Sequence, residues 1–317
     1  MPNWFQKFGY GEFIHLEHRN CEACMMKGDR LFRVVKENCF DAETRKREMA
    51  ASQVSTQVLS VIPVLFNYWA KPQDGLETSR YFNDFIAETV ARDPNRFIGL
   101  GTLPMQDVDK AIDELERCKN ELQLKGVEIG TNINGENLSE KKYFPFFERA
   151  ESLGMSVFIH PWEMMGMQQM RKYWLPWLVG MPAETSRAIC SMIFGGVFEK
   201  FPNLKVAFAH GGGSFPFTFG RIHHGFEVRP DLTAIDNTEN PGKYIGKFWF
   251  DSLVHDRTAL QYLIDFAGED KICLGTDYPF PLGELVPGAL IESLEIENNL
   301  REKLLYKNAT DWLGLTH

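Results

Sequence analysis

The chain has 317 residues, of which 44% are hydrophobic and 24% are charged, and its formal net charge is -9. These values are typical of a globular protein with a large core, and they exclude a chain that is mostly disordered. The acidic balance argues against a nucleic-acid or anionic-membrane surface, because both need clustered Lys and Arg. No apolar run reaches the length of a membrane span, so we expect a cytoplasmic (cytosolic) protein.

The first forty residues predict a small antiparallel element. In MMKGDRLFRVVKEN the Gly-Asp pair has turn chemistry, and the residues after it form a returning strand. Alternation along that strand predicts that the Arg33 side chain points to the opposite face from Phe32 and Val34. We therefore expect a single domain, with an insertion hairpin in residues 1–40 and a barrel in residues 41–317.

Beyond the hairpin, short apolar runs alternate with longer amphipathic segments, which is the pattern of βαβ units. Polar residues at the ends of several strands favour a (β/α)8 TIM barrel over a doubly wound sheet. The predicted strands, seven in number, are Gln57–Val64, Phe97–Leu103, Gly126–Thr131, Ser156–His160, Lys205–His210, Phe248–Val254 and Ile272–Asp277. The predicted helices are Ala42–Ala51, Thr78–Arg92, Val108–Leu122, Glu140–Leu153, Ala183–Lys200, Arg257–Ala267 and Arg301–Leu313.

Three of these strands end in residues that bind metals or protons. His160 ends SVFIH, His210 ends KVAFAH before three glycines, and Asp277 ends ICLGTD. The carboxyl ends of barrel strands meet on one face, so these side chains are expected to converge on a zinc or similar divalent ion. One such histidine alone is more often a packed residue, but the three together favour a functional site. Asp251 in FWFDSLV either supports that site or is a buried, hydrogen-bonded acid.

A few further side chains are candidates for substrate binding. Arg33 and Arg221 could each bind a carboxylate through a bidentate pair of hydrogen bonds. A surface salt bridge is an equally good explanation for either arginine taken alone. Trp177 and Phe280 could form the wall of a pocket for a planar conjugated substrate, although aromatic clusters more often belong to a core.

Taken together, five stretches resemble a known family. They are FRVVKEN, FIHPWEMMGM, KYWLPWLVGMPAET, EKFPNLKVAFAHGGGSFPFTFGR and LGTDYPFPLGE. They are similar to the 2-amino-3-carboxymuconate 6-semialdehyde decarboxylases of the amidohydrolase superfamily. The resemblance implies a zinc-bearing barrel that removes a carboxylate without redox chemistry and forms 2-aminomuconate 6-semialdehyde. That reaction lies on the kynurenine route of tryptophan catabolism, where it diverts flux from quinolinate and allows picolinate to form.

The resemblance also implies roles for single residues. His160 and Asp277 correspond to zinc ligands, and His210 corresponds to the base that deprotonates the zinc-bound water. Arg33 corresponds to a clamp for a substrate carboxylate. Arg221 corresponds to a second clamp that reaches the neighbouring subunit's site, which implies a homodimer.

The chain departs from this family at its first strand. The family begins with a strand that ends in His-x-His, and both histidines bind zinc; the chain as given has no such pair, in agreement with the seven predicted strands. We therefore expect weak zinc binding and little or no activity. Three functions stay open: this decarboxylase, a metal-dependent hydrolase of lactones or amides on the same scaffold, and an inactive isoform that dimerises with full-length subunits and modulates them.

Overall fold

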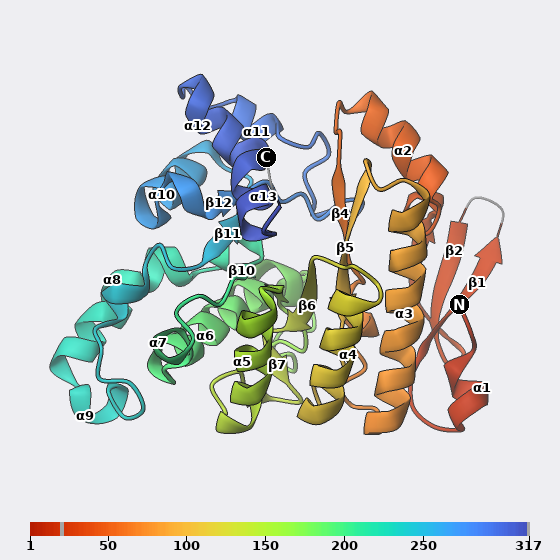
Figure 1. Ribbon diagram of the computed structural model, residues 1–317, viewed down its shortest axis with the longest axis horizontal. Coiled ribbons are helices and arrows are strands. Elements are labelled where there is room, and N and C mark those ends of the chain that lie inside the picture. Colours follow the sequence, from red (N-terminus) through yellow and green to blue (C-terminus); the bar gives the residue numbers. More distant parts are fainter. Residues whose placement is uncertain (20–21, 316–317) are drawn as a thin grey trace.

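The computed structural model describes residues 1–19 and 22–315 (Figure 1). Its central element is a parallel sheet of seven strands in the order β12-β11-β10-β9-β6-β5-β4. Every strand falls inside one of the predicted ranges, which confirms the seven strands and their direction. The strands are β4 (Gln57–Leu59), β5 (Phe97–Thr102), β6 (Gly126–Gly130), β9 (Ser156–His160), β10 (Val206–Phe208), β11 (Trp249–Asp251) and β12 (Ile272–Cys273).

Helices follow the strands, as the predicted βαβ pattern requires. In Figure 1, α3, α4 and α5 stand side by side along one flank of the sheet. Two helices, α2 and α10, have the bounds predicted from sequence. The longer helices are α2 (Ala42–Ala51), α3 (Pro72–Arg92), α4 (Val108–Asn120), α5 (Phe144–Leu153), α6 (Met181–Phe194), α8 (Phe215–Val228) and α10 (Arg257–Ala267). The shorter ones are α1 (Trp4–Phe8), α7 (Val197–Lys200), α9 (Pro230–Thr233), α11 (Ala289–Glu292), α12 (Asn298–Glu302) and α13 (Asn308–Trp312).

The apolar runs become strands because the sheet is covered on both faces. All five residues of β6 are buried, as are all three of β10. Alternate residues such as Val127 and Ile129 pack into the large core shared with the helices. The residue between them, Glu128, points to the other face, because successive side chains of a strand alternate. That other face lines the interior of the barrel.

The N-terminal segment forms a separate antiparallel sheet of three strands: β1 (Ile14–Arg19), β2 (Glu22–Lys27) and β3 (Arg30–Lys36). The predicted hairpin is confirmed as β2 and β3. The predicted orientation of Arg33 relative to Phe32 is wrong, because a bulge places Met25 opposite Arg33 but Met26 opposite Leu31. The extra residue breaks strict alternation. As a result Phe32 and Arg33 both line the interior cavity.

The two ends of the large sheet border a broad cavity. Within the described residues β4 and β12 are the sheet's end strands and are not paired with each other. The cavity has a volume of about 2000 Å³, and residues of β4 and of the loop after β12 are part of its lining. This volume exceeds the roughly 300–1,000 Å³ of ordinary small-molecule pockets. A small substrate would therefore occupy only part of it.

None of the helices in the described part of the chain combines the length and apolarity needed to cross a bilayer.

Candidate metal and substrate site

His160 is held at the end of β9 as a buried, neutral imidazole. Its Nδ1 lies 3.1 Å from the carbonyl oxygen of Pro161. Because that oxygen can only accept, Nδ1 carries the hydrogen and Nε2 keeps its lone pair. Burial, and then the neighbouring His210, hold the pKa of His160 well below its ordinary value. A neutral imidazole with one lone pair free and the other nitrogen fixed by a backbone carbonyl is the form that binds metals.

His210 follows β10 in a backbone conformation fixed by Asp251. The carboxylate of Asp251, at the end of β11, accepts hydrogen bonds from the backbone N–H groups of His210 (2.9 Å), Gly211 (2.9 Å) and Leu253 (3.1 Å). His210 has a φ of 56°, a left-handed conformation that these bonds stabilise. Of the two roles considered for Asp251, it therefore has the supporting one, since it positions His210.

Close backbone approaches around His210 explain the glycines nearby. Gly213 has a φ of 64°, and a Cβ there would lie 2.3 Å from the Pro182 carbonyl oxygen. A Cβ on Gly275 would lie 2.5 Å from the Cβ of Asp251. Neither position has room for a side chain. The run of glycines after His210 and the Gly275-Thr276-Asp277 sequence are therefore needed for packing as well as for the site.

Asp277 completes a cluster of three donor groups. One ligand atom from each of His160, His210 and Asp277 lies within 4.8 Å of the others. The rings of His160 and His210 meet edge to face, with centroids 4.8 Å apart. The convergence predicted from the strand ends is thus present in the fold. Burial raises the pKa of the Asp277 carboxyl, against the lowering effect of His210. A cation would relieve that penalty, so these residues fit a divalent metal.

The predicted substrate-binding residues divide into two groups. The guanidinium of Arg33 lies 5.2 Å from the ring centroid of Phe280, a stacked geometry, and both line the cavity together with Asp277. Trp177 also lines the cavity and packs against Trp174, with ring centroids 5.9 Å apart. Arg221, on α8, is exposed and is not among the described residues that line the cavity.

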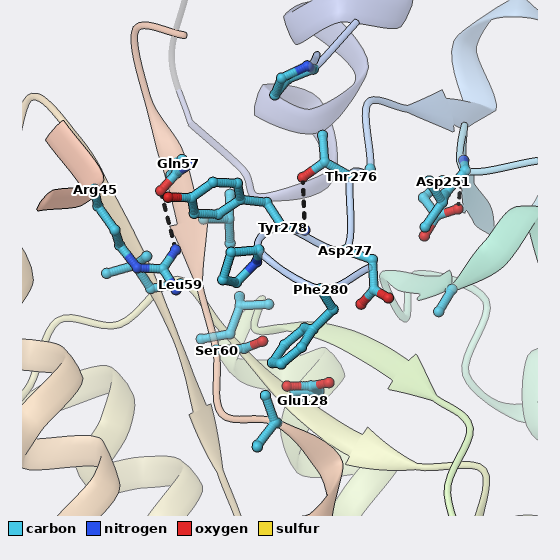
Figure 2. Close-up of a pocket in the computed structure, with 18 of the residues that line it drawn as sticks. Arg45, Gln57, Leu59, Ser60, Glu128, Asp251, Thr276, Asp277, Tyr278 and Phe280 are labelled. Carbon is cyan, nitrogen blue, oxygen red and sulfur yellow. Dashed lines mark hydrogen bonds between the residues drawn. The ribbon is translucent and has the colours of Figure 1, made fainter. Parts of the chain in front are cut away.

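Two polar residues of the cavity were missed by sequence reasoning. Glu128 lies in the middle of β6, and its carboxyl group faces the cavity (Figure 2). Its signal was a charged residue inside an otherwise apolar strand, GVEIG. The guanidinium carbon of Arg45, on α2, lies over the ring of Tyr278, 5.1 Å from its centroid. Arg45 also donates a hydrogen bond to Gln57 (3.3 Å). No pattern in the sequence distinguishes Arg45 from the other cations of its helix.

The comparisons with known proteins agree with this fold. The family described as amidohydrolase matches residues 35–315. A 2-amino-3-carboxymuconate-6-semialdehyde decarboxylase of Dictyostelium discoideum is 58% identical over 316 residues, which cover 99% of this chain and 88% of the relative. One of Caenorhabditis elegans is 39% identical, over 99% of this chain and 91% of the relative.

One solved structure of similar fold contains a bound metal. A dihydroxybenzoic acid decarboxylase from Polaromonas, crystallised with manganese and the inhibitor 2-nitroresorcinol, superposes with a TM-score of 0.77 at 26% identity. The match covers 86% of this chain and 85% of that one. The chain belongs to the amidohydrolase family and, within it, to the family of the 2-amino-3-carboxymuconate-6-semialdehyde decarboxylases. The resemblance inferred from its motifs is confirmed.

Proposed function

We propose that this protein catalyses the metal-dependent, non-oxidative decarboxylation of 2-amino-3-carboxymuconate 6-semialdehyde to 2-aminomuconate 6-semialdehyde in tryptophan catabolism. The observation that carries the proposal is the cluster of His160, His210 and Asp277 beside Arg33, in a chain 58% identical to a decarboxylase of that name. The reaction breaks one carbon–carbon bond, releases carbon dioxide and puts a proton on the carbon that carried the carboxylate.

We propose zinc as the ion. The imidazole nitrogen of His160 and the carboxylate oxygen of Asp277 suit zinc, although the Polaromonas relative was crystallised with manganese. When bound, such a cation supplies Lewis-acid activation of water. His160 and Asp277 are its proposed protein ligands. His210, held in place by Asp251, is the proposed proton acceptor. One of its ring nitrogens lies within 4.8 Å of the donor atoms of His160 and Asp277, so it can reach the same position in the cavity.

The substrate is a dianion, so its binding needs positive charge in an acidic protein. Arg33 is the proposed clamp for one carboxylate, and Phe280 and Trp177 are the proposed apolar walls. We further propose that residues 1–40, which contribute Arg33, form an insertion to a barrel made of residues 41–317, in a single cytosolic domain.

Release of carbon dioxide from freshly prepared substrate tests the reaction. Protein stripped with a chelator and reloaded with zinc or with manganese should release carbon dioxide only when loaded, and the metal content per chain should be measured alongside. Turnover of lactones or amides instead would favour the hydrolase. Absence of both metal and turnover would favour the inactive isoform, which must then lower the activity of a full-length relative when the two are co-expressed. The metal content per chain also decides between this proposal and the weak zinc binding and low activity expected from the missing His-x-His pair.

We propose a homodimer in which Arg221 enters the neighbouring subunit's site. Its exposure on α8, away from the cavity of its own chain, supports this. Subunit mixing is the test. Arg221→Ala and His210→Asn should each be nearly inactive alone, and mixing them should restore part of the activity, because a mixed dimer has one site with both residues intact. Mixing without any recovery contradicts the shared site.

A further inference from the structure

Glu128 is a buried acid without a full set of partners. Its side chain is among the least exposed in the protein, at 1% relative exposure, and its Oε2 has no hydrogen-bond partner within the described residues. Buried polar groups are almost always paired, and an orphaned one costs on the order of 1–3 kcal/mol. An orphaned donor or acceptor that lines a cavity is therefore a group that a ligand can satisfy.

The position of Glu128 places this atom beside the proposed site. Its neighbours on β6, Val127 and Ile129, pack into the outer core, whereas Glu128 lines the cavity. Figure 2 shows its carboxyl group facing the ring of Phe280, with Ser60 and Asp277 on either side in that view. It is not part of the cluster of possible metal donors. A role in contact with the substrate fits this placement better than a role as a ligand.

The protonation state decides which role the group can take. Burial raises the pKa of Glu128 to about 8; the Ser60 hydroxyl opposes the rise, and the negative charge of Asp277 adds to it. Of the described residues, those that act on this carboxyl are a hydroxyl and an acid, with no cation among them, so burial favours the carboxylic acid, which has an O–H to donate. An ionised Glu128 would instead add a second negative charge beside Asp277 and would repel an anionic substrate.

We propose that Glu128 is a specificity-determining residue that donates a hydrogen bond from its carboxyl group to a carboxylate oxygen of an unsaturated dicarboxylate bound in the cavity. The inference rests on the proposed function, because it assigns one contact to that substrate. Arg33 binds one carboxylate through charge, and Glu128 recognises the other without adding a cation. The pair distinguishes a dicarboxylate from a monocarboxylate of the same carbon chain.

Calorimetric titration of the metal-free protein with trans,trans-muconate tests this contact. Muconate is a planar conjugated dicarboxylate, and sorbate is a matched probe with a single carboxylate. Glu128→Gln keeps a neutral donor and should bind muconate within about twofold of wild type. Glu128→Met removes the donor at similar size and should bind it about 10- to 100-fold more weakly, the effect of losing a hydrogen bond to a charged acceptor. Sorbate affinity should change less than threefold or so in either variant.

Several outcomes would overturn the inference. These are a loss in Glu128→Gln equal to that in Glu128→Met, which would mean that an ionised carboxylate is needed; unchanged muconate affinity in Glu128→Met; and absence of muconate binding by the wild type. Thermal unfolding checks that each variant is folded, and Glu128→Ala replaces Glu128→Met if the latter is not. The proposed function fails separately: muconate binding that depends on Glu128 without carbon dioxide release would retain this contact and reject the decarboxylase.

Discussion

The two sides of the cavity are built differently. On one side His160 and His210 follow the neighbouring parallel strands β9 and β10 and are fixed by hydrogen bonds with the backbone or from it, and Asp277 lies in the loop after β12. On the other side Arg33 comes from a small antiparallel sheet outside the barrel and meets Phe280 by stacking. The first arrangement is set by strand geometry, and the second by the packing of two separate units. Metal chemistry and substrate recognition should therefore be separable by mutation.

The largest expected effect is on the metal side. Asp277→Asn replaces a charged ligand by a neutral amide, so we expect loss of the bound metal and activity lower by about 1,000-fold or more. Elemental mass spectrometry after dialysis, together with carbon dioxide release, measures both. Asp270→Asn, at an exposed carboxylate that pairs with Lys303 away from the cavity, is the matched control, and it should retain metal and activity. Full metal content in Asp277→Asn would remove Asp277 from the ligand set.

A smaller effect is expected for Asp251, which positions His210 but is not itself a proposed metal ligand. Asp251→Asn leaves one amide oxygen to accept from three backbone N–H groups, so the His210 loop should lose part of its order. Activity should fall by about 10- to 100-fold, as for other residues that orient a site. The fall should be in kcat, with KM nearly unchanged. A change in KM alone would place Asp251 on the recognition side instead.

On the side of the cavity that holds Arg33, we expect a substitution to change KM rather than kcat. Arg33→Gln removes the charge that faces the substrate, and KM should rise by about 10-fold, with metal content per chain unchanged. Arg30→Gln, on the same strand but exposed and paired with Glu12, should leave KM as it is. Loss of metal in Arg33→Gln would show that the two sides are not independent.

The smallest effect concerns stability rather than turnover. The Glu128 carboxyl has a pKa of about 8 when folded and an ordinary value of 4.5, so the folded state binds a proton that the unfolded state releases between these values. Its contribution to stability is complete below pH 4.5 and is lost as pH rises through 8. From pH 5 to pH 9 the wild type should lose about 4 kcal/mol of unfolding free energy relative to Glu128→Gln. Urea titrations at both pH values measure this, and parallel curves would contradict it.

The sequence predicts the metal side better than the recognition side. His160, His210 and Asp277 each end an apolar run, and the rule that barrel strands present their carboxyl ends to one face is enough to bring them together. The face of Phe32 relative to Arg33 was mispredicted because a bulge changes the alternation at Phe32, and bulges have no signature in a period-two pattern. The bulge arises from the pairing of β2 with β3, so it cannot be predicted from the alternation within either strand alone.

Two further gaps have the same origin. Glu128 acquires its unusual chemistry only when β6 is covered on both faces, so its protonation depends on the assembled barrel. Helix α8 was not predicted because FPFTFGRIHHGFEV is aromatic on several sides and contains two glycines, so its helical periodicity is weak. In the fold its first residue, Phe215, is fully buried against the core.

The bulge in β3 also affects how this protein can evolve. Because the one extra residue decides which way Phe32 faces, while Arg33 keeps its regular pairing with Met25, a one-residue deletion at the bulge would turn the phenyl ring away from the cavity and leave the guanidinium in place. Such changes alter no strand of the barrel and no metal donor. The wall of the cavity beside Arg33 can therefore change through a single deletion in this hairpin, while the strands that lead to the proposed metal donors stay as they are.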